Sequence, residues 1–163
     1  KDCVNLLDGG QKAIEHLAVG DRIWSLTPDG RSFIPDEIIM MMHNGPISQV
    51  SHPPPVSLLS INSSGATVLF YTFHTIDGHH VSLTATHNIP VFLDDTQQRI
   101  FLPASQVTLK HRLIMQHRHV AILNITSETR VGFYSPLTMS GYMFVNNIST
   151  SVFSISEHVG CAV

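Results

Sequence analysis

Residues 81–90 read Val81-Ser82-Leu83-Thr84-Ala85-Thr86-His87-Asn88-Ile89-Pro90, and this stretch joins a strand pattern to two chemically active side chains. Apolar and polar residues alternate over 81–86, which is typical of a half-buried strand. Pro90 cannot donate to a sheet ladder, so we expect the strand to close there. Thr84 and His87 stand three residues apart, where a hydroxyl and an imidazole can act on one buried amide. Such a pair is usually a turn hydroxyl and a surface histidine, but here Cys3 lies near the start of the same chain.

Short segments with strand character alternate with turn signals along the whole chain. Turns are expected at 27–30 (Thr-Pro-Asp-Gly), 77–78 (Asp-Gly) and 135–138 (Ser-Pro-Leu-Thr). Further strands are expected at 22–26, 31–42, 56–61, 68–73, 99–102, 111–115, 120–125, 130–133 and 142–145. No long stretch has helical periodicity, and 163 residues suffice for one well-buried domain. The sequence therefore predicts a single all-β domain of many short strands.

One segment interrupts this pattern. From His43 to Pro55 the composition shifts to Asn, Gly, Ser, Pro and His, and the segment ends in Pro53-Pro54-Pro55. Such a composition favours a loop with local polyproline character. We expect residues 43–65 to form an insertion loop that projects from the domain.

Composition excludes several classes of function. The formal net charge is −3 and no basic stripe is present, which argues against nucleic-acid binding. The 11 histidines are scattered without a metal-ligand spacing, so we expect neither a metal nor a cofactor. No apolar run is long enough to span a membrane.

The cysteines and glycosylation sequons point to the secretory pathway. The two cysteines, Cys3 and Cys161, could pair as they would in a secreted protein. Sequons begin at Asn62, Asn124 and Asn147, and these three are the glycosylation candidates. We expect the protein in the endoplasmic reticulum or outside the cell, with a targeting sequence upstream in a longer precursor.

Several motifs in order resemble a Hint domain, the self-processing module of hedgehog proteins and inteins. They are Cys3, the run Leu17-Ala18-Val19-Gly20-Asp21-Arg22-Ile23, the block Thr84-Ala85-Thr86-His87, Ser135-Pro136-Leu137-Thr138 with Gly141, and Val145-Asn146-Asn147. The chain lacks the terminal His-Asn of inteins, so the hedgehog type is the nearer resemblance. It implies a disc of two similar subdomains over 1–163, with 1–2 ending an upstream flank and 155–163 beginning a further region.

The resemblance also implies a chemistry. The Cys3 thiol would attack the Asp2 carbonyl and convert the peptide bond to a thioester, with His87 giving the proton to the leaving nitrogen and Thr84 holding the amide. The upstream flank would then pass to an acceptor, which in hedgehogs is cholesterol activated by an aspartate. His43 occupies the place of that aspartate here, either as a general base or as a plain loop residue. The acceptor is therefore open: a sterol, another lipid alcohol, a thiol or water.

Two departures from the hedgehog pattern keep alternatives open. Asp2 stands where hedgehogs have Gly, and Val152 replaces their late cysteine. One alternative is an inactive, secreted Hint-fold scaffold or binding module with a Cys3–Cys161 disulfide. A Cys-His hydrolase acting on separate substrates is disfavoured, because the nucleophile lies at the start of the chain. The leading hypothesis is a monomeric, single-turnover autoprocessing domain whose substrate is its own amino-terminal flank.

Overall fold

The computed structural model describes residues 2–27, 32–45, 67–116 and 118–154. In these parts of the chain the regular elements are thirteen strands and two short 3₁₀ helices. The strands are β1 (Cys3–Asn5), β2 (Gln11–Ala13), β3 (Arg22–Leu26), β4 (Phe33–Gly45), β5 (Thr67–Thr75), β6 (His80–Thr84), β7 (Asn88–Leu93), β8 (Gln98–Pro103), β9 (Arg112–Ile114), β10 (His119–Val131), β11 (Phe133–Thr138), β12 (Tyr142–Val145) and β13 (Ile148–Ser151), and the helices are η1 (Ile14–His16) and η2 (Ala104–Gln106). The prediction of an all-β fold is confirmed.

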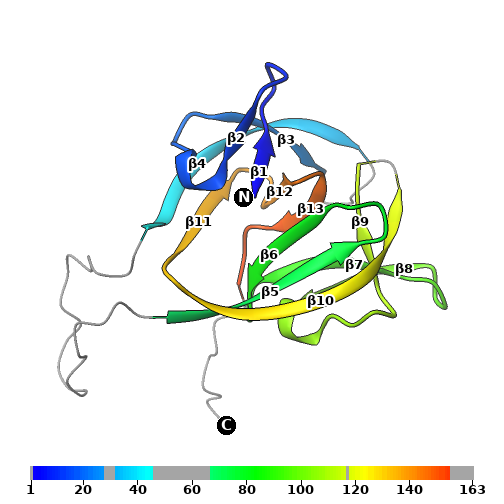
Figure 1. The fold of residues 1–163 in the computed structure, drawn as a ribbon. Coiled ribbons are helices and arrows are strands. Elements are labelled where there is room, and N and C mark those ends of the chain that lie inside the picture. Colours follow the sequence, from blue (N-terminus) through cyan, green and yellow to red (C-terminus); the bar gives the residue numbers. More distant parts are fainter. Residues whose placement is uncertain (1, 28–31, 46–66, 117, 155–163) are drawn as a thin grey trace, which may run out of the picture.

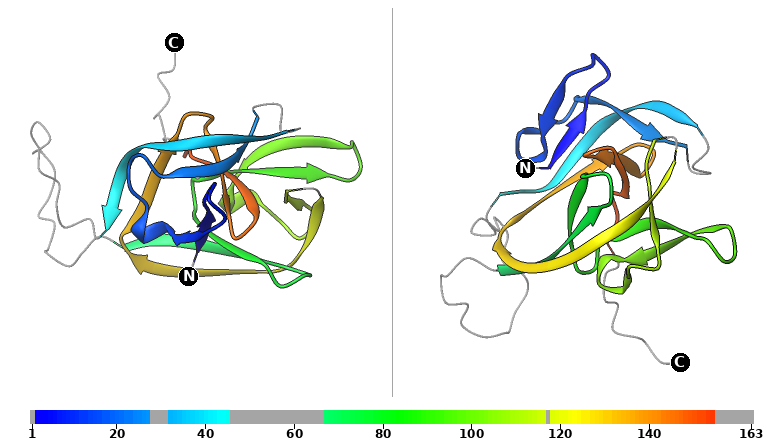
Figure 2. Two further views of the ribbon diagram at one scale, coloured as in Figure 1. Left: turned by 90° about the horizontal axis from the view of Figure 1, so that it is seen from above. Right: turned by 45° about the vertical axis from the view of Figure 1, so that its right-hand side comes forward.

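The strands form three sheets that wrap around the amino-terminal strand. Their orders are β13-β12-β1-β2, β6-β5-β10-β9-β7-β8 and β11-β4-β3. Figure 1 shows β1 and β12 near the centre, between the β3–β4 ribbon and the long β5–β10 pair. In both views of Figure 2 the amino terminus lies at the margin of the fold, at the start of the blue amino-terminal hairpin. Strand β1, at the start of the described chain, is thus held by β12, which lies near its end.

One structural unit occurs twice. In the first copy β2 runs directly into η1 and a turn leads to β3; in the second β8 runs into η2 and a turn leads to β9. In both copies the residue before the 3₁₀ helix is extended, with φ −63° and ψ 143° at Ala13 and φ −61° and ψ 145° at Pro103. The repeat matches the expected construction from two similar subdomains.

The core joins all three sheets. Its fully buried members include Phe73 of β5, Ile23 of β3, Ile38 of β4, Leu113 of β9 and Ile148 of β13. In β6 the buried Val81 and Leu83 alternate with partly exposed residues, as expected for a strand with one face towards the core. Burial of apolar surface stabilises a fold by about 25 cal/mol per Å². This shared core is therefore the main source of stability.

The structure corrects two expectations about the lengths of strands. Strand β4 continues through His43 to Gly45, because Asn44 and Gly45 pair with Tyr134 and Phe133 of β11. The expectation of a loop is therefore wrong for residues 43–45. Residues 46–65 lie outside the described residues, as does the strand expected at 56–61. The segments 120–125 and 130–133 were expected as separate strands, but β10 spans His119–Val131, because β9 pairs with residues 119–121 and β5 with residues 122–131.

Both prolines that were expected to interrupt a strand lie within one. Pro90 is the third residue of β7 and pairs with Phe101 of β8, while the other neighbour, β9, pairs only with the following Val91 and Phe92. Pro136 lies in β11 opposite Met41, at an irregularity in the pairing. Each proline thus occupies a position where a missing N–H costs the sheet little.

Candidate active site

The Asp2–Cys3 peptide bond is held on both sides by hydrogen bonds. Cys3 begins β1, which lies between β2 and β12. The Asp2 carbonyl oxygen accepts from the Ile14 N–H at 3.1 Å, and the Cys3 N–H donates to Asn146 Oδ1 at 2.9 Å. The Asn146 N–H donates in turn to the Cys3 carbonyl at 2.8 Å. Both polar groups of this peptide are therefore engaged, and the carbonyl already faces a donor.

Asn146 owes its position to a tight turn. Val145 of β12 pairs with Ile148 of β13, which leaves Asn146 and Asn147 as a two-residue hairpin loop. Both asparagines have positive φ, 49° and 67°, as a type I′ turn requires and as Asn tolerates well. The turn brings the Asn146 side chain against the start of β1.

Thr84 and His87 lie at the ends of one β-turn. Thr84 ends β6, and its carbonyl accepts from the His87 N–H at 3.0 Å. The start of η2 fixes this turn from outside, because Ala104 N–H donates to the His87 carbonyl and Ser105 N–H to the Ala85 carbonyl. The Thr-x-x-His spacing thus produces a rigid turn that presents both side chains.

The ring of His87 is oriented by a main-chain carbonyl. Its Nε2 lies 2.7 Å from the Ser151 carbonyl oxygen, which can only accept, so Nε2 carries a hydrogen and Nδ1 is left for chemistry. Burial lowers the pKa of His87 below its ordinary value of 6.5, and the bond to Ser151 partly opposes that shift. At neutral pH the ring is a neutral base that takes up a proton and can then donate it.

Two adjoining cavities connect the peptide bond to this turn. The apolar cavity, of about 250 Å³, is lined by Asp2, Ile14, Phe70, Ser82, Phe133 and Tyr134 among others. The turn cavity, of about 70 Å³, is lined by the same residues except Asp2, and also by Thr84 and His87. Ile14, which donates to the Asp2 carbonyl, therefore also lines the cavity of the Thr84–His87 turn. In the described part of the chain His87 makes its ring hydrogen bond to Ser151 and not to the Cys3 peptide.

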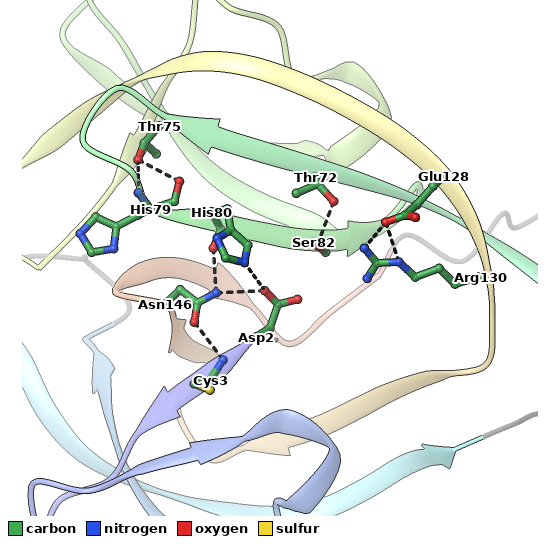
Figure 3. Close-up of polar contacts among 10 residues, drawn as sticks. All are labelled: Asp2, Cys3, Thr72, Thr75, His79, His80, Ser82, Glu128, Arg130 and Asn146. Carbon is green, nitrogen blue, oxygen red and sulfur yellow. Dashed lines mark hydrogen bonds and ion pairs between the residues drawn. The ribbon is translucent and has the colours of Figure 1, made fainter.

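The side chain of Asp2 rests on β6, as Figure 3 shows. Asn146 Nδ2 donates to Asp2 Oδ1 at 3.0 Å, and His80 Nε2 lies 3.7 Å from the same oxygen. Burial raises the pKa of Asp2, while His80, Arg130 and the Ser82 N–H act in the opposite direction. His80, Ser82 and Thr84 share one face of β6, because side chains alternate along a strand. Asp2 therefore lies on the face that ends in Thr84.

The remaining sequence candidates are distributed differently. The backbone of His43 lies in β4 between Met41 and Asn44, whose partners Pro136 and Tyr134 both line the turn cavity. Cys3 is a free cysteine, which does not fit the Cys3–Cys161 disulfide of the alternative hypothesis. Cys161 itself lies outside the described residues. Val152 is buried in the core.

The three sequons differ in accessibility. Asn124 is exposed on β10. The Asn147 side chain accepts a hydrogen bond from Asn5 Nδ2 at 2.7 Å, and Ser149 of the same sequon is fully buried. Asn62 lies outside the described residues.

The comparisons with known proteins agree with this architecture. A family model described as "Hint module" matches residues 1–162, so the chain belongs to the Hint family. It is 23% identical to Protein hedgehog of Drosophila melanogaster over 157 residues, which covers 92% of this chain and 29% of that protein. It is 27% identical to Warthog protein 4 of Caenorhabditis elegans over 171 residues, with 95% and 27% covered. The chain thus spans less than a third of the length of these curated relatives.

Solved structures with the same fold include inteins. A DnaB intein from Synechocystis sp. has a TM-score of 0.70 at 14% identity and covers 92% of this chain and 93% of its own. A bacterial intein-like domain from Clostridium thermocellum has a TM-score of 0.66 at 13% identity, with 92% and 94% covered. No helix among the described residues is long and apolar enough to cross a membrane.

Three contributors to the site were not identified from the sequence: Ile14, His80 and Asn146. Ile14 acts through its main-chain N–H, which carries no side-chain signature. His80 was grouped with the scattered histidines, although its position two residues before Ser82 places it on the face of β6 that carries Thr84. The Asn146-Asn147 pair is a turn signal, but only the fold brings that turn to Cys3.

Proposed function

We propose that this domain cleaves its own Asp2–Cys3 peptide bond and passes the upstream flank to a nucleophile. The Cys3 Sγ attacks the Asp2 carbonyl carbon, a C–S bond forms, and the C–N bond breaks as the Cys3 nitrogen takes up a proton. The product is a thioester between Asp2 and the Cys3 side chain, with a free α-amino group on Cys3. Attack by the second nucleophile then releases the flank and restores the thiol.

The observation that carries this proposal is the hydrogen bonding of the peptide bond itself. The Ile14 N–H bonds the Asp2 oxygen, and that bond strengthens as the oxygen becomes an oxyanion. Thr84 and His87 line the adjoining cavity, and Cys3 carries a free thiol. In this proposal Nδ1 of His87 takes the proton that the Cys3 thiol loses and then gives it to the leaving nitrogen, while Nε2 stays fixed on Ser151. Thr84 helps to hold the amide.

The acceptor enters through the apolar cavity. Phe70, Phe133 and Tyr134 line it, and Asp2 forms part of its wall. Apolar walls favour an apolar acceptor, such as a sterol or another lipid alcohol, over water. His43 is the proposed general base for that second step, since its strand runs beside residues of the neighbouring turn cavity. Processing of this kind fits a protein of the secretory pathway that is released or membrane-attached through a lipid.

Replacement of the nucleophile tests the proposal. A longer precursor with its native upstream segment is expected to yield two fragments on a gel, and Cys3→Ala is expected to leave it whole. His87→Ala is expected to leave it whole as well, even with added thiol. Continued cleavage of the Cys3→Ala precursor at the same bond would refute the proposal.

A further inference from the structure

The side chain that precedes the proposed nucleophile has a binding site of its own. Only 18% of the Asp2 side chain is exposed. Its carboxylate accepts from Asn146 Nδ2, His80 Nε2 lies 3.7 Å from Oδ1, and Ser82 lines the same cavity. These contacts are made to the Asp2 side chain and not to the main-chain bond that follows it, so they depend on which residue precedes Cys3.

The site offers polar partners to a carboxylate. The ring nitrogen of His80 and the side-chain amide of Asn146 both face Asp2 Oδ1. Arg130 attracts the same carboxylate from across the polar cavity, of about 300 Å³, which Asp2, His80, Ser82, Glu128 and Arg130 line with other residues. In Figure 3 Asn146 and the His80 ring both face the Asp2 carboxylate from one side, and the Arg130–Glu128 pair lies on the other. An apolar side chain here would leave these donors without their acceptor.

Asn146 connects this site to the bond that breaks. Its Nδ2 has two hydrogens, one given to Asp2 Oδ1 and the other to the His80 carbonyl at 2.9 Å. The side-chain amide is thereby fixed in orientation, and Oδ1 faces the Cys3 N–H at 2.9 Å. As the Cys3 nitrogen leaves it gains a proton and positive charge, so its hydrogen bond to Oδ1 becomes charge-assisted and stronger. Only an interaction that strengthens in the transition state accelerates the reaction.

We propose that His80, Ser82 and Asn146 form a subsite that selects an acidic side chain before the nucleophile, and that Asn146 couples its occupancy to the leaving nitrogen. The inference rests on the proposed self-cleavage. A flank that ends in a carboxylate completes the hydrogen bonding of Asn146 and keeps Oδ1 on the Cys3 N–H. A flank that ends in an apolar residue frees the amide to rotate away.

The test measures release of the upstream fragment from the precursor in dithiothreitol, which reports thioester formation without the acceptor step. Asp2 and Asp2→Leu are compared in the wild-type, Asn146→Ala and Asn147→Ala backgrounds. Asn147 is the matched control, because it shares the turn and the positive φ but bonds Asn5 instead of the cleaved peptide. We expect Asp2→Leu to slow release at least about tenfold, or about 1.4 kcal/mol, in the wild-type and Asn147→Ala backgrounds. In Asn146→Ala the two flanks are expected to differ by less than about twofold, as a double-mutant cycle reveals.

A second exchange covers the case in which Asn146→Ala does not fold. Asn146→Asp keeps the shape and the acceptor for Cys3 but opposes Asp2 with a like charge, so release is expected to slow. Asp2→Asn in that background supplies an amide donor again, and the rate is expected to recover. Equal release from Asp2 and Asp2→Leu in the wild-type background would overturn the subsite while leaving self-cleavage intact. Failure of the wild-type precursor to cleave at all, like Cys3→Ala, would overturn the proposed function and the subsite together.

Discussion

Asp36 anchors the connection that leads into β12, and its removal should destabilise the fold measurably. Only 8% of Asp36 is exposed. Its Oδ1 accepts from the Glu37 N–H at 2.7 Å and the Met139 N–H at 3.2 Å, and its Oδ2 accepts from the Ser140 N–H at 3.0 Å. The last two bonds tie β4 to the turn between β11 and β12. That turn sets the path of β12 towards Asn146.

The expected cost follows from these three bonds. Hydrogen bonds to a charged group contribute about 1.5–3 kcal/mol each, but the exposed Met139 and Glu37 can turn to water. Asp36→Ala should therefore lower the free energy of unfolding by about 3 kcal/mol, mainly through Ser140. Asp36→Asn keeps one oxygen, but its amide nitrogen would face the Ser140 N–H as donor against donor. It should lose about 2 kcal/mol despite its nearly identical shape.

Urea titration of the folded domain measures these differences. The midpoint is expected to fall while the slope with denaturant stays constant, which identifies a loss of stability without a change in compactness. Glu37→Ala is the control, since that side chain is exposed on the same strand and should change stability by less than about 0.5 kcal/mol. If Asp36→Asn is as stable as the wild type, the assignment of Oδ2 as an acceptor for Ser140 is wrong.

Three further predictions concern other parts of the molecule. Because burial holds the pKa of His87 below 6.5, the unfolded chain binds this proton first as pH falls. The free energy of unfolding should then fall below about pH 6.5 by up to about 1.4 kcal/mol per unit, and His87→Gln should remove that part of the slope in urea titrations. Equal slopes in both proteins would contradict the buried, neutral ring. Ser149 Oγ is buried without a hydrogen-bond partner among the described residues, so Ser149→Ala should stabilise the domain by about 1 kcal/mol. A thermal scan that shows a lower midpoint would contradict this. His43→Ala should still release the flank in dithiothreitol, which is partly ionised without help, but not with a neutral alcohol; loss of both would place His43 in the first step or in folding.

Much of the fold was predictable from local patterns. Alternation along Val81–Leu83 and the Asp77-Gly78 turn gave β6 and its hairpin with β5, which the structure confirms. The lengths of β4 and β10 were not predictable, because residues such as Asn44 and Gly45 have weak strand preference and extend only since β11 pairs with them. Pro90 and Pro136 were misjudged for a related reason. A proline is excluded only where a strand has a partner for the missing N–H, and pairing is a property of the whole sheet.

The same contrast between local patterns and sheet pairing applies to the candidate site. Cys3 and His87 were predicted from the sequence because the motifs that contain them resemble those of a Hint domain. The groups that orient the Asp2–Cys3 bond are the Ile14 main chain, the Asn146 amide and the His80 face of β6. The Ile14 main chain follows the hairpin in which Cys3 pairs with Ala13. The Asn146 amide reaches Cys3 only through pairing between segments more than a hundred residues apart, Val4 with Val145. No local pattern records such a pairing.

The mass of the released amino-terminal fragment tests self-cleavage most directly. The longer precursor is incubated with hydroxylamine, which converts a thioester to a hydroxamate and leaves ordinary peptide bonds intact. We expect a fragment that ends in a hydroxamate on Asp2, together with a domain that begins at Cys3, and neither product from Cys3→Ala. A fragment that ends elsewhere, or the same fragment from Cys3→Ala, would contradict a thioester between Asp2 and Cys3.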